Sequence, residues 1–263
     1  MSQQQSIESA LKDPAPEIGY PLPATVELHR GLFDQTTGTW QTAAEVRELT
    51  GADEEYLASF EAKATTTYAD YTSALLKRAV VSVGSINIEE SPEVIEHLIL
   101  GDRDTLFMAI VKATYGVNRE YVVKCPSCGN KNDVVVNLDD DFPVSSTDKD
   151  IQGPLTTTLR NGSSVKFRLP NGSDSVHVAK HATNTAAQNT LMLARCVILS
   201  PEELKGKSPE DWAKSLNIAD RSKLIKAILE IKVGPQLEEV NVQCAHCGTN
   251  MPLGITWMSL LFG

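Results

Sequence analysis

Apolar residues recur at helical spacing through most of residues 43–116, and this pattern predicts a run of helices. A short helix is expected over 44–49, ending before Gly51, and Asp53 is expected to cap the helix that follows. One helical face is marked by residues three or four positions apart: Tyr68, Tyr71, Leu75 and Ala79. Before this region, residues 25–29 alternate between polar and apolar side chains, which is typical of a strand.

Start and stop signals predict two further helices. Residues 91–93 (Ser-Pro-Glu) combine an N-cap residue, a proline suited to the first turn and an acid suited to the helix dipole. That helix is expected to end at Gly101, and Asp102 is expected to cap another helix that runs to Gly116. Residues 24–116 are therefore predicted to form a mainly helical N-terminal domain.

Two stretches with a period of two predict β-hairpins. In the first, residues 121–124 lead into a turn and residues 133–138 lead out of it, with apolar residues on one face. In the second, residues 239–242 and 251–255 flank a similar turn. The segment between the hairpins, 142–236, is long enough to be an inserted subdomain.

The inserted segment has its own pattern of strands and helices. Residues 155–160 and 165–169 predict a hairpin around residues 161–162 (Asn-Gly), a dipeptide that favours a tight turn. Helices are expected after it, the last capped by Asp220 and ended by residues 234–235 (Gly-Pro). The sequence shows no internal repeat beyond a pair of cysteine motifs. The predicted fold class is α+β, with this segment as an inserted α+β subdomain.

Each predicted hairpin carries a C-x-x-C-G motif at its turn. Such a pair brings two thiolates within reach of one metal ion, and the glycine permits the positive φ with which the chain turns back toward sulfur. Two pairs complete a closed tetrahedral shell, which is typical of structural zinc. The predicted zinc ligands are Cys125, Cys128, Cys244 and Cys247. A split zinc ribbon is therefore expected over 117–141 and 237–263, with the metal closing the 115 residues between the pairs.

Other metal and redox interpretations fit the residues less well. Iron also takes four thiolates, but a ribbon favours zinc, and redox C-x-x-C motifs do not normally occur twice with a trailing glycine. His246 lies inside the second motif and is expected to be exposed. His177 and His181 lack the glutamate of a zincin motif. Residues 139–141 (Asp-Asp-Asp) lack the glycine and distal glutamate of a calcium loop, and Cys196 is expected to be a buried, inert thiol.

Composition narrows the class of protein. The net charge of −10 disfavours a nucleic-acid binder, because phosphate contacts need clustered Lys and Arg. No apolar run is long enough to predict a membrane span. We infer a protein kept in a reducing cytoplasm, where paired cysteines are more often metal ligands than disulfides.

Residues 1–23 hold four prolines among polar residues and are expected to form an extended arm. The apolar residues 257–262 are expected either to dock into the fold or to contact a partner.

Motifs of known enzyme classes are missing from the sequence. It has no G-x-S-x-G, no Walker-type phosphate loop and no dinucleotide glycine pattern. Its acidic residues are better explained as helix caps and solvated faces than as a catalytic set. We therefore predict no catalytic residues, no cofactor-binding residues beyond the metal ligands, and no enzymatic activity.

Three stretches resemble a signature of the baseplate hub and hub assembly chaperone proteins of T-even-type contractile-tailed phages. They are residues 44–55 (AEVRELTGADEE), 100–104 (LGDRD) and 113–116 (ATYG), the last followed by the first cysteine motif. The resemblance covers about residues 25–140, and the second cysteine motif with its apolar tail fits the end. Residues 1–23 have no match in the signature.

The resemblance implies a non-catalytic structural or assembly protein of the virion's tail baseplate, present in the host cytoplasm during assembly. Its partners would be other baseplate and tail proteins, in a symmetric multi-subunit assembly. This is the leading hypothesis, and a zinc-ribbon nucleic-acid-binding protein is the alternative. Within the helical domain, Arg103 is expected either to pair with Glu48, Asp53 or another acid, or to lie on the surface.

Overall fold

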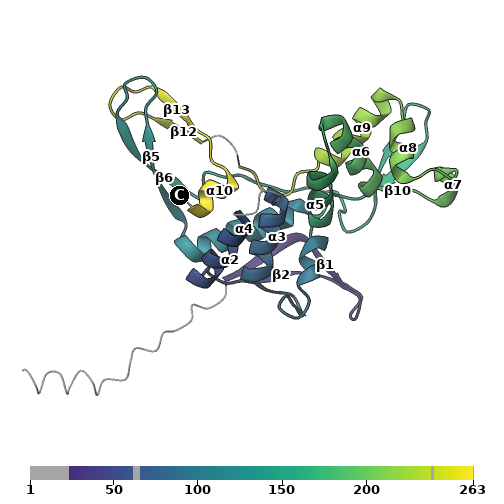
Figure 1. Ribbon diagram of the computed structural model, residues 1–263, viewed down its shortest axis with the longest axis horizontal. Coiled ribbons are helices and arrows are strands. Elements are labelled where there is room, and N and C mark those ends of the chain that lie inside the picture. Colours follow the sequence, from purple (N-terminus) through teal and green to yellow (C-terminus); the bar gives the residue numbers. More distant parts are fainter. Residues whose placement is uncertain (1–23, 62–65, 238–239, 263) are drawn as a thin grey trace, which may run out of the picture.

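The computed structural model describes residues 24–61, 66–237 and 240–262. The arm expected over 1–23 lies outside the described residues. Figure 1 shows three parts: a central unit of sheet and helices, a second unit rich in helices, and two hairpins that project side by side from the central unit. The mixture of helices and strands confirms the α+β class.

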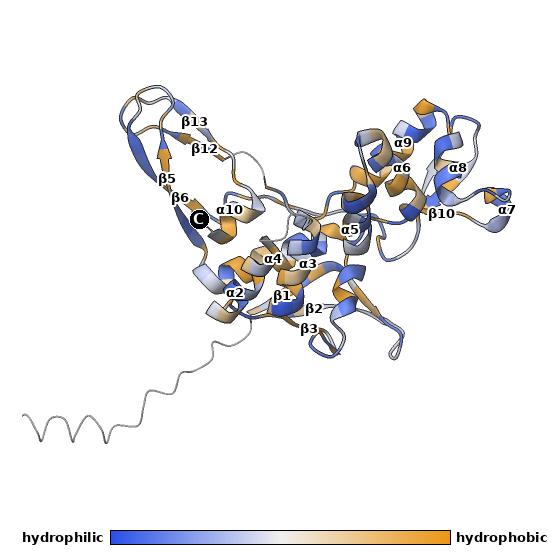
Figure 2. Cartoon of the chain, in the orientation of Figure 1, coloured by the Kyte–Doolittle hydropathy of each residue, from blue (hydrophilic) through white to orange (hydrophobic). Residues whose placement is uncertain are grey.

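The central unit has a four-stranded antiparallel sheet of order β1-β2-β3-β4. Its elements are β1 (Ala24–Asp34), β2 (Thr39–Val46), α2 (Gly51–Glu61), α3 (Tyr68–Ala79), β3 (Val80–Val83), β4 (Ile86–Asn87), the 3-10 helix η1 (Pro92–His97) and α4 (Leu100–Tyr115). Helices α3 and α4 lie over the sheet, and Figure 2 shows apolar residues gathered where they face it. Leu75, Leu106 and Ile110 are fully buried in this core.

The helix expected over 44–49 is wrong, because its first three residues belong to β2. Ala44 and Val46 are fully buried and Glu45 between them is exposed, which is the period of a strand. β1 pairs with one edge of β2 and β3 pairs with the other. The pairing of a central strand therefore outweighs the helical propensity of this run.

The second unit occupies the inserted segment. Its elements are β8 (Leu155–Thr158), β9 (Ser164–Phe167), α5 (Gly172–His181), α6 (Thr185–Cys196), β10 (Val197–Ile198), α7 (Pro201–Leu204), α8 (Pro209–Ser215) and α9 (Ile218–Leu229). The strands form an antiparallel sheet of order β10-β9-β8. Where the chain enters and leaves this unit, β7 (Val144–Ser145) pairs with β11 (Gly234–Pro235).

Three aspartates expected to cap helices lie instead at the third helical position: Asp53 in α2, Asp102 in α4 and Asp220 in α9. Gly101, expected to end a helix, is the second residue of α4. The buried carboxylate of Asp102 accepts the backbone N–H of His29 at 2.7 Å and of Gly31 at 2.8 Å. Because it bonds these groups of β1, it does not cap α4. These partners lie in β1 and leave no signal in the sequence around Asp102.

The two units are copies of one arrangement, so the expectation of no further repeat is wrong. Each has a hairpin, two helices, a strand that pairs with the second hairpin strand, a short helix and a long helix. Val80 of β3 lies opposite Val46 of β2, and Val197 of β10 lies opposite Phe167 of β9. Both third strands begin directly after the second helix of their unit.

A matching network joins an aspartate to two arginines in each unit. In the first, Asp53 pairs with Arg47 at 2.7 Å and with Arg78 at 2.9 Å. In the second, Asp174 pairs with Arg168 at 2.6 Å and with Arg195 at 2.7 Å. The two further bonds match as well, because Arg47 donates to the Arg78 carbonyl at 2.7 Å and Arg168 donates to the Arg195 carbonyl at 2.9 Å.

A second matching network surrounds the long helices. Arg103 of α4 donates to the Ile95 carbonyl and to Ser73 Oγ, at 2.9 and 2.7 Å. The corresponding bonds of Arg221 in α9 run to the Ala213 carbonyl and to Thr190 Oγ1, at 3.5 and 2.7 Å. The acids before these arginines also match, since Asp102 accepts the N–H of His29 and Asp220 accepts the N–H of Arg160.

The expectation that Arg103 pairs with an acid is confirmed, but the acid is neither Glu48 nor Asp53. Arg103 lies 3.5 Å from Glu96 and is itself buried. Asp53 is already occupied by Arg47 and Arg78. The interpretation of Arg103 as a surface residue is wrong.

The C-terminal residues dock into the fold. They form helix α10 (Trp257–Phe262), in which Leu260 and Leu261 are buried. Trp257 meets Phe107 of α4 edge to face, with ring centroids 5.2 Å apart. Of the two expectations for this segment, docking is therefore confirmed.

Candidate metal centre

Two antiparallel hairpins carry the cysteine motifs. The first consists of β5 (Asn118–Lys124) and β6 (Lys131–Asn137), and the second of β12 (Val240–Gln243) and β13 (Asn250–Leu253). Figure 1 shows both hairpins extending in the same direction, with their turns together at the far end. The turns are remote in sequence and adjacent in space.

Each turn has the same local geometry. Gly129 and Gly248 have φ of 76° and 70°, in the left-handed region that favours glycine. The N–H of Gly129 donates to the Cys125 carbonyl at 3.0 Å, and the N–H of Gly248 donates to the Cys244 carbonyl at 2.9 Å. These bonds close the turns and direct both cysteines of each motif to one side.

The structure brings the four predicted ligands together. The sulfurs of Cys125, Cys128, Cys244 and Cys247 all lie within 4.8 Å of one another. Cys125 Sγ is 3.7 Å from Cys247 Sγ, and Cys128 Sγ is 3.6 Å from Cys244 Sγ. A tetrahedron with Zn–S bonds of about 2.3 Å has sulfurs about 3.8 Å apart, whereas a disulfide needs about 2.05 Å. The donor set therefore fits a tetrahedral metal ion and not a pair of disulfides.

Asn132 links the two turns, and the sequence reasoning missed it. Its Oδ1 accepts the N–H of Ala245 at 2.9 Å, and its Nδ2 donates to the Asn130 carbonyl at 3.2 Å. Asn132 is buried at the inward position that Val134 and Val136 continue along β6. The sequence does mark this residue, because Asn132 is polar at a position where the alternation of β6 calls for an apolar side chain.

The pKa values of the cysteine thiols diverge, because four thiols that can each ionise lie side by side. Burial opposes ionisation of Cys244, but the N–H groups of His246 and Cys247 lower its pKa to about 6. The N–H of Asn130 favours the Cys128 thiolate, but burial and the neighbouring sulfurs outweigh it and raise the pKa to about 11. A divalent cation would favour the thiolate of every ligand at once.

The other candidate groups stay apart from this centre. His177 and His181 lie on α5, where their rings stack with centroids 4.3 Å apart. Asp139 forms an ion pair with Lys112 on the surface. Burial, followed by the nearby Asp174 charge, raises the pKa of Cys196 to about 12, as expected for an inert thiol. Within the described ranges, the four cysteines are the group found that could hold a metal.

The fold and site define an α+β protein with a four-cysteine centre held between two hairpins. The family model of the T4 bacteriophage base plate protein matches residues 38–258. The chain belongs to this family, as the resemblance in its sequence indicated. No curated protein and no solved structure matches it.

Membership of this family makes the chain a phage tail baseplate protein. Other phage tail proteins are therefore its class of partner, and the virion tail is its location. The family is one of baseplate structural proteins. Among the described residues, none of the helices combines the length and the apolar character that a membrane span needs.

Proposed function

We propose that this protein is a structural and assembly component of the baseplate hub, acting through protein–protein contacts and without catalysis. The observation that carries the proposal is the family match over residues 38–258, together with the hub-type signature of residues 44–55. The protein is present in the host cytoplasm during assembly and in the tail baseplate afterwards, as part of a symmetric multi-subunit assembly.

A structural zinc ion is the second part of the proposal. Cys125, Cys128, Cys244 and Cys247 would hold it as a closed four-thiolate shell, and the two hairpins would form a split zinc ribbon. Closing a loop of about 100 residues costs about 5 kcal/mol of chain entropy. Zinc ligation in small peptides supplies about 10–16 kcal/mol at neutral pH, so the metal can offset this cost.

The outer face of the first hairpin is the contact surface that this proposal favours. Val122 and Val135 are 67% and 60% exposed on it, on adjacent strands. The proposed arm, residues 1–23, is a second contact. The C-terminal helix is not assigned a contact surface of its own in this proposal, because its Leu260 and Leu261 are buried in the fold.

Deletion of the gene in its phage tests the proposal. Tails assembled without the protein are expected to lack complete baseplates in electron micrographs, and wild-type protein supplied from a plasmid should restore them. The Cys128→Ser, Cys247→Ser double variant is expected to fail, whereas His246→Ala, a change at an exposed residue of the same turn, should restore assembly. Intact baseplates on the deletion tails would overturn the assembly role.

The alternative function, nucleic-acid binding by the zinc ribbon, has weaker support. Lys124 and Lys131 lie opposite each other at the end of the first hairpin. Asp133 follows on the same exposed face, and the net charge of the chain is −10. Tight, salt-sensitive retention of labelled DNA or RNA in a filter-binding assay would favour this alternative.

A further inference from the structure

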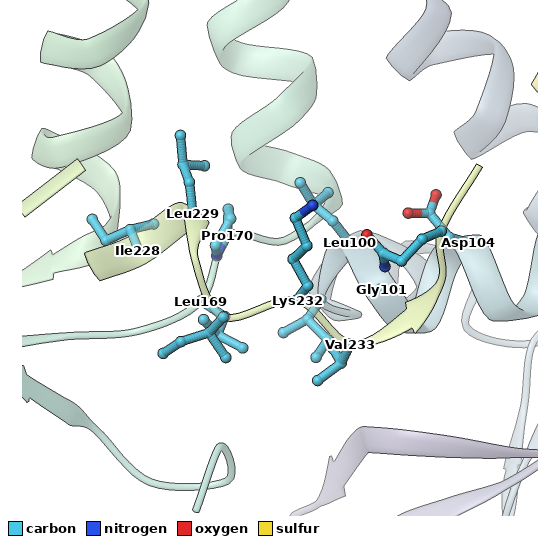
Figure 3. Close-up of a pocket in the computed structure, with 12 residues that line it drawn as sticks. Leu100, Gly101, Asp104, Leu169, Pro170, Ile228, Leu229, Lys232 and Val233 are labelled. Carbon is cyan, nitrogen blue, oxygen red and sulfur yellow. The ribbon is translucent and has the colours of Figure 1, made fainter. Parts of the chain in front are cut away.

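The two repeated units meet inside the chain through a short antiparallel junction. Leu98–Leu100, which leads into α4, lies against Pro170–Gly172, which leads into α5. Gly172 N–H donates to the Leu98 carbonyl at 3.1 Å, and Leu100 N–H donates to the Pro170 carbonyl at 3.2 Å. Figure 3 shows Leu100 and Pro170 on the walls of one pocket, contributed by the two units.

The junction is closely packed. A Cβ on Gly172 would lie 2.3 Å from Arg103 Nη1, so the guanidinium of one unit covers the first helical residue of the other. Ile99 and Leu169 are 1% and 4% exposed in a small apolar cluster at the same place. The first unit contributes the loop before its long helix and the second contributes the loop after its hairpin. The junction is therefore head-to-tail.

Each half of this junction has a counterpart in the other unit. Leu49–Gly51 corresponds to Pro170–Gly172, because both segments follow the first arginine of the matched Asp–Arg network. Leu216–Ile218 corresponds to Leu98–Leu100, because both precede the matched Asp-Arg pair of the long helix. Ile218 is 82% exposed, and no described atom lies within 4 Å of a Cβ built on Gly51.

The hydrogen-bonding groups used in the junction are left over in these counterparts. In the part of the chain that the structure describes, the Gly51 N–H and the Leu49 carbonyl have no hydrogen-bond partner. The same is true of the Ile218 N–H and the Leu216 carbonyl. Each of the two surfaces therefore offers one N–H donor and one carbonyl acceptor, in the arrangement that the internal junction pairs.

A cavity of about 240 Å³ opens beside Gly51. Its walls combine apolar and polar side chains from α2, α3, α4, α10 and the loop before α2: Leu49, Thr50, Glu54, Leu57, Tyr71, Thr114, Tyr115 and Leu261. An apolar cavity of about 150 Å³ can hold benzene, so this one has room for an aliphatic side chain. Ile218 is the exposed aliphatic residue that the counterpart surface presents.

We propose that copies of this chain associate head to tail, with Leu216–Ile218 of one copy paired antiparallel with Leu49–Gly51 of the next. Arg221 of one copy then covers Gly51 of its neighbour, as Arg103 covers Gly172 within the chain. A heterologous contact of this kind produces a ring if the rotation closes and a helical array if it does not. The inference deepens the proposed assembly function by naming a second copy as a partner, and its argument is the duplicated junction.

The contact between copies is weaker than the internal junction. Within the chain, Lys180 of α5 and Asp70 of α3 form an ion pair at 2.8 Å across the units. The corresponding residues of the outer surfaces are Ser59 and Ala187, which form no such pair. The internal junction also has the high effective concentration of a tethered partner. Association between copies is therefore reversible and depends on protein concentration.

Sedimentation velocity of the full chain over a range of concentrations tests the contact. The parent is expected to form dimers and larger species as concentration rises, while Gly51→Glu and Ile218→Glu each stay monomeric. Both changes place an acid at the first position of a helix, where the dipole favours it, so neither should impair folding. The control Val144→Glu, at a 65% exposed residue outside both surfaces, should associate like the parent.

Mixing the two blocked variants separates this contact from any symmetric one. The Gly51 variant keeps an intact Ile218 surface and the Ile218 variant keeps an intact Gly51 surface. An equimolar mixture is therefore expected to form dimers and nothing larger. A parent that stays monomeric, or a mixture that stays monomeric, overturns the proposal. Either result would leave the proposed baseplate role standing, because the gene-deletion experiment tests that role and does not depend on self-association.

Discussion

At the scale of single residues, buried carboxylates with two arginine partners stabilise each unit. Asp53 and Asp174 are fully buried, and each contacts two guanidinium groups. Burial by itself would raise the pKa of Asp53, but the hydrogen bonds from Arg47 and Thr50 hold it well below its usual range. The pKa of Asp174 is lowered against burial in the same way by Arg168. Such groups make stability dependent on pH.

Replacement of Asp53 by asparagine tests this dependence. A carboxylate with a depressed pKa contributes stability above its unfolded-state pKa of about 3.9, and the contribution is lost as the pH falls further. Asp53→Asn leaves two arginines without their charge partner and is expected to lower the free energy of unfolding by about 3–5 kcal/mol at pH 7. The difference from the parent should shrink below about pH 4, as measured by urea denaturation.

The control for this prediction is Asp140→Asn, at an exposed residue of the loop after β6. It should change the free energy of unfolding by less than about 0.5 kcal/mol. A difference between Asp53→Asn and the parent that is the same at pH 7 and pH 3 would contradict an electrostatic role.

At the scale of elements, the C-terminal helix shows how burial decides between two interpretations of one apolar segment. Leu260 of α10 is fully buried in the core of the central unit. Tyr121 of the first hairpin donates its hydroxyl proton to the Ser259 carbonyl at 3.3 Å. The helix therefore joins the base of that hairpin to the core.

Truncation of Leu260 tests the docking of this helix. Leu260→Ala removes buried methyl groups and leaves a cavity, so it is expected to lower the free energy of unfolding by about 2–5 kcal/mol. Val135→Ala, at a 60% exposed residue, is the matched truncation and should have a small effect. Equal thermal unfolding of Leu260→Ala and the parent would show that the helix contributes nothing to stability.

At the scale of the whole molecule, the buried residues of the cysteine centre belong to neither of the two main cores. The core of the second unit, around Leu193 and Leu224, shares no residue with the small cluster of Cys125, Cys244 and Met251. Loss of the proposed metal should therefore loosen the hairpin tips and leave the units folded.

Hydrogen exchange with and without a strong chelator checks this expectation. Amide protection should fall within residues 123–132 and 242–251 and stay unchanged in α6 and α9. Elemental analysis of the untreated protein should find about one zinc per chain. Unchanged protection at the hairpin tips, together with the absence of zinc and iron from the protein, would contradict the proposed metal site.

The sequence alone determined the features that depend on neighbouring residues. The C-x-x-C-G motifs predicted both turns, because cysteine spacing and a glycine with positive φ are local requirements. Alternation predicted the two hairpins, and the signature in residues 44–55 indicated the family that the match over 38–258 shows.

The tertiary structure decided the features that depend on distant partners. Residues 44–46 became a strand because β1 and β3 flank them, and Asp102 moved inside its helix because its partners lie in β1. The repeat is hidden in sequence because few of its positions must be identical. An Asp–Arg network can persist in both units while the residues around it diverge. Packing of one unit against the other then decides which surface of each unit is buried.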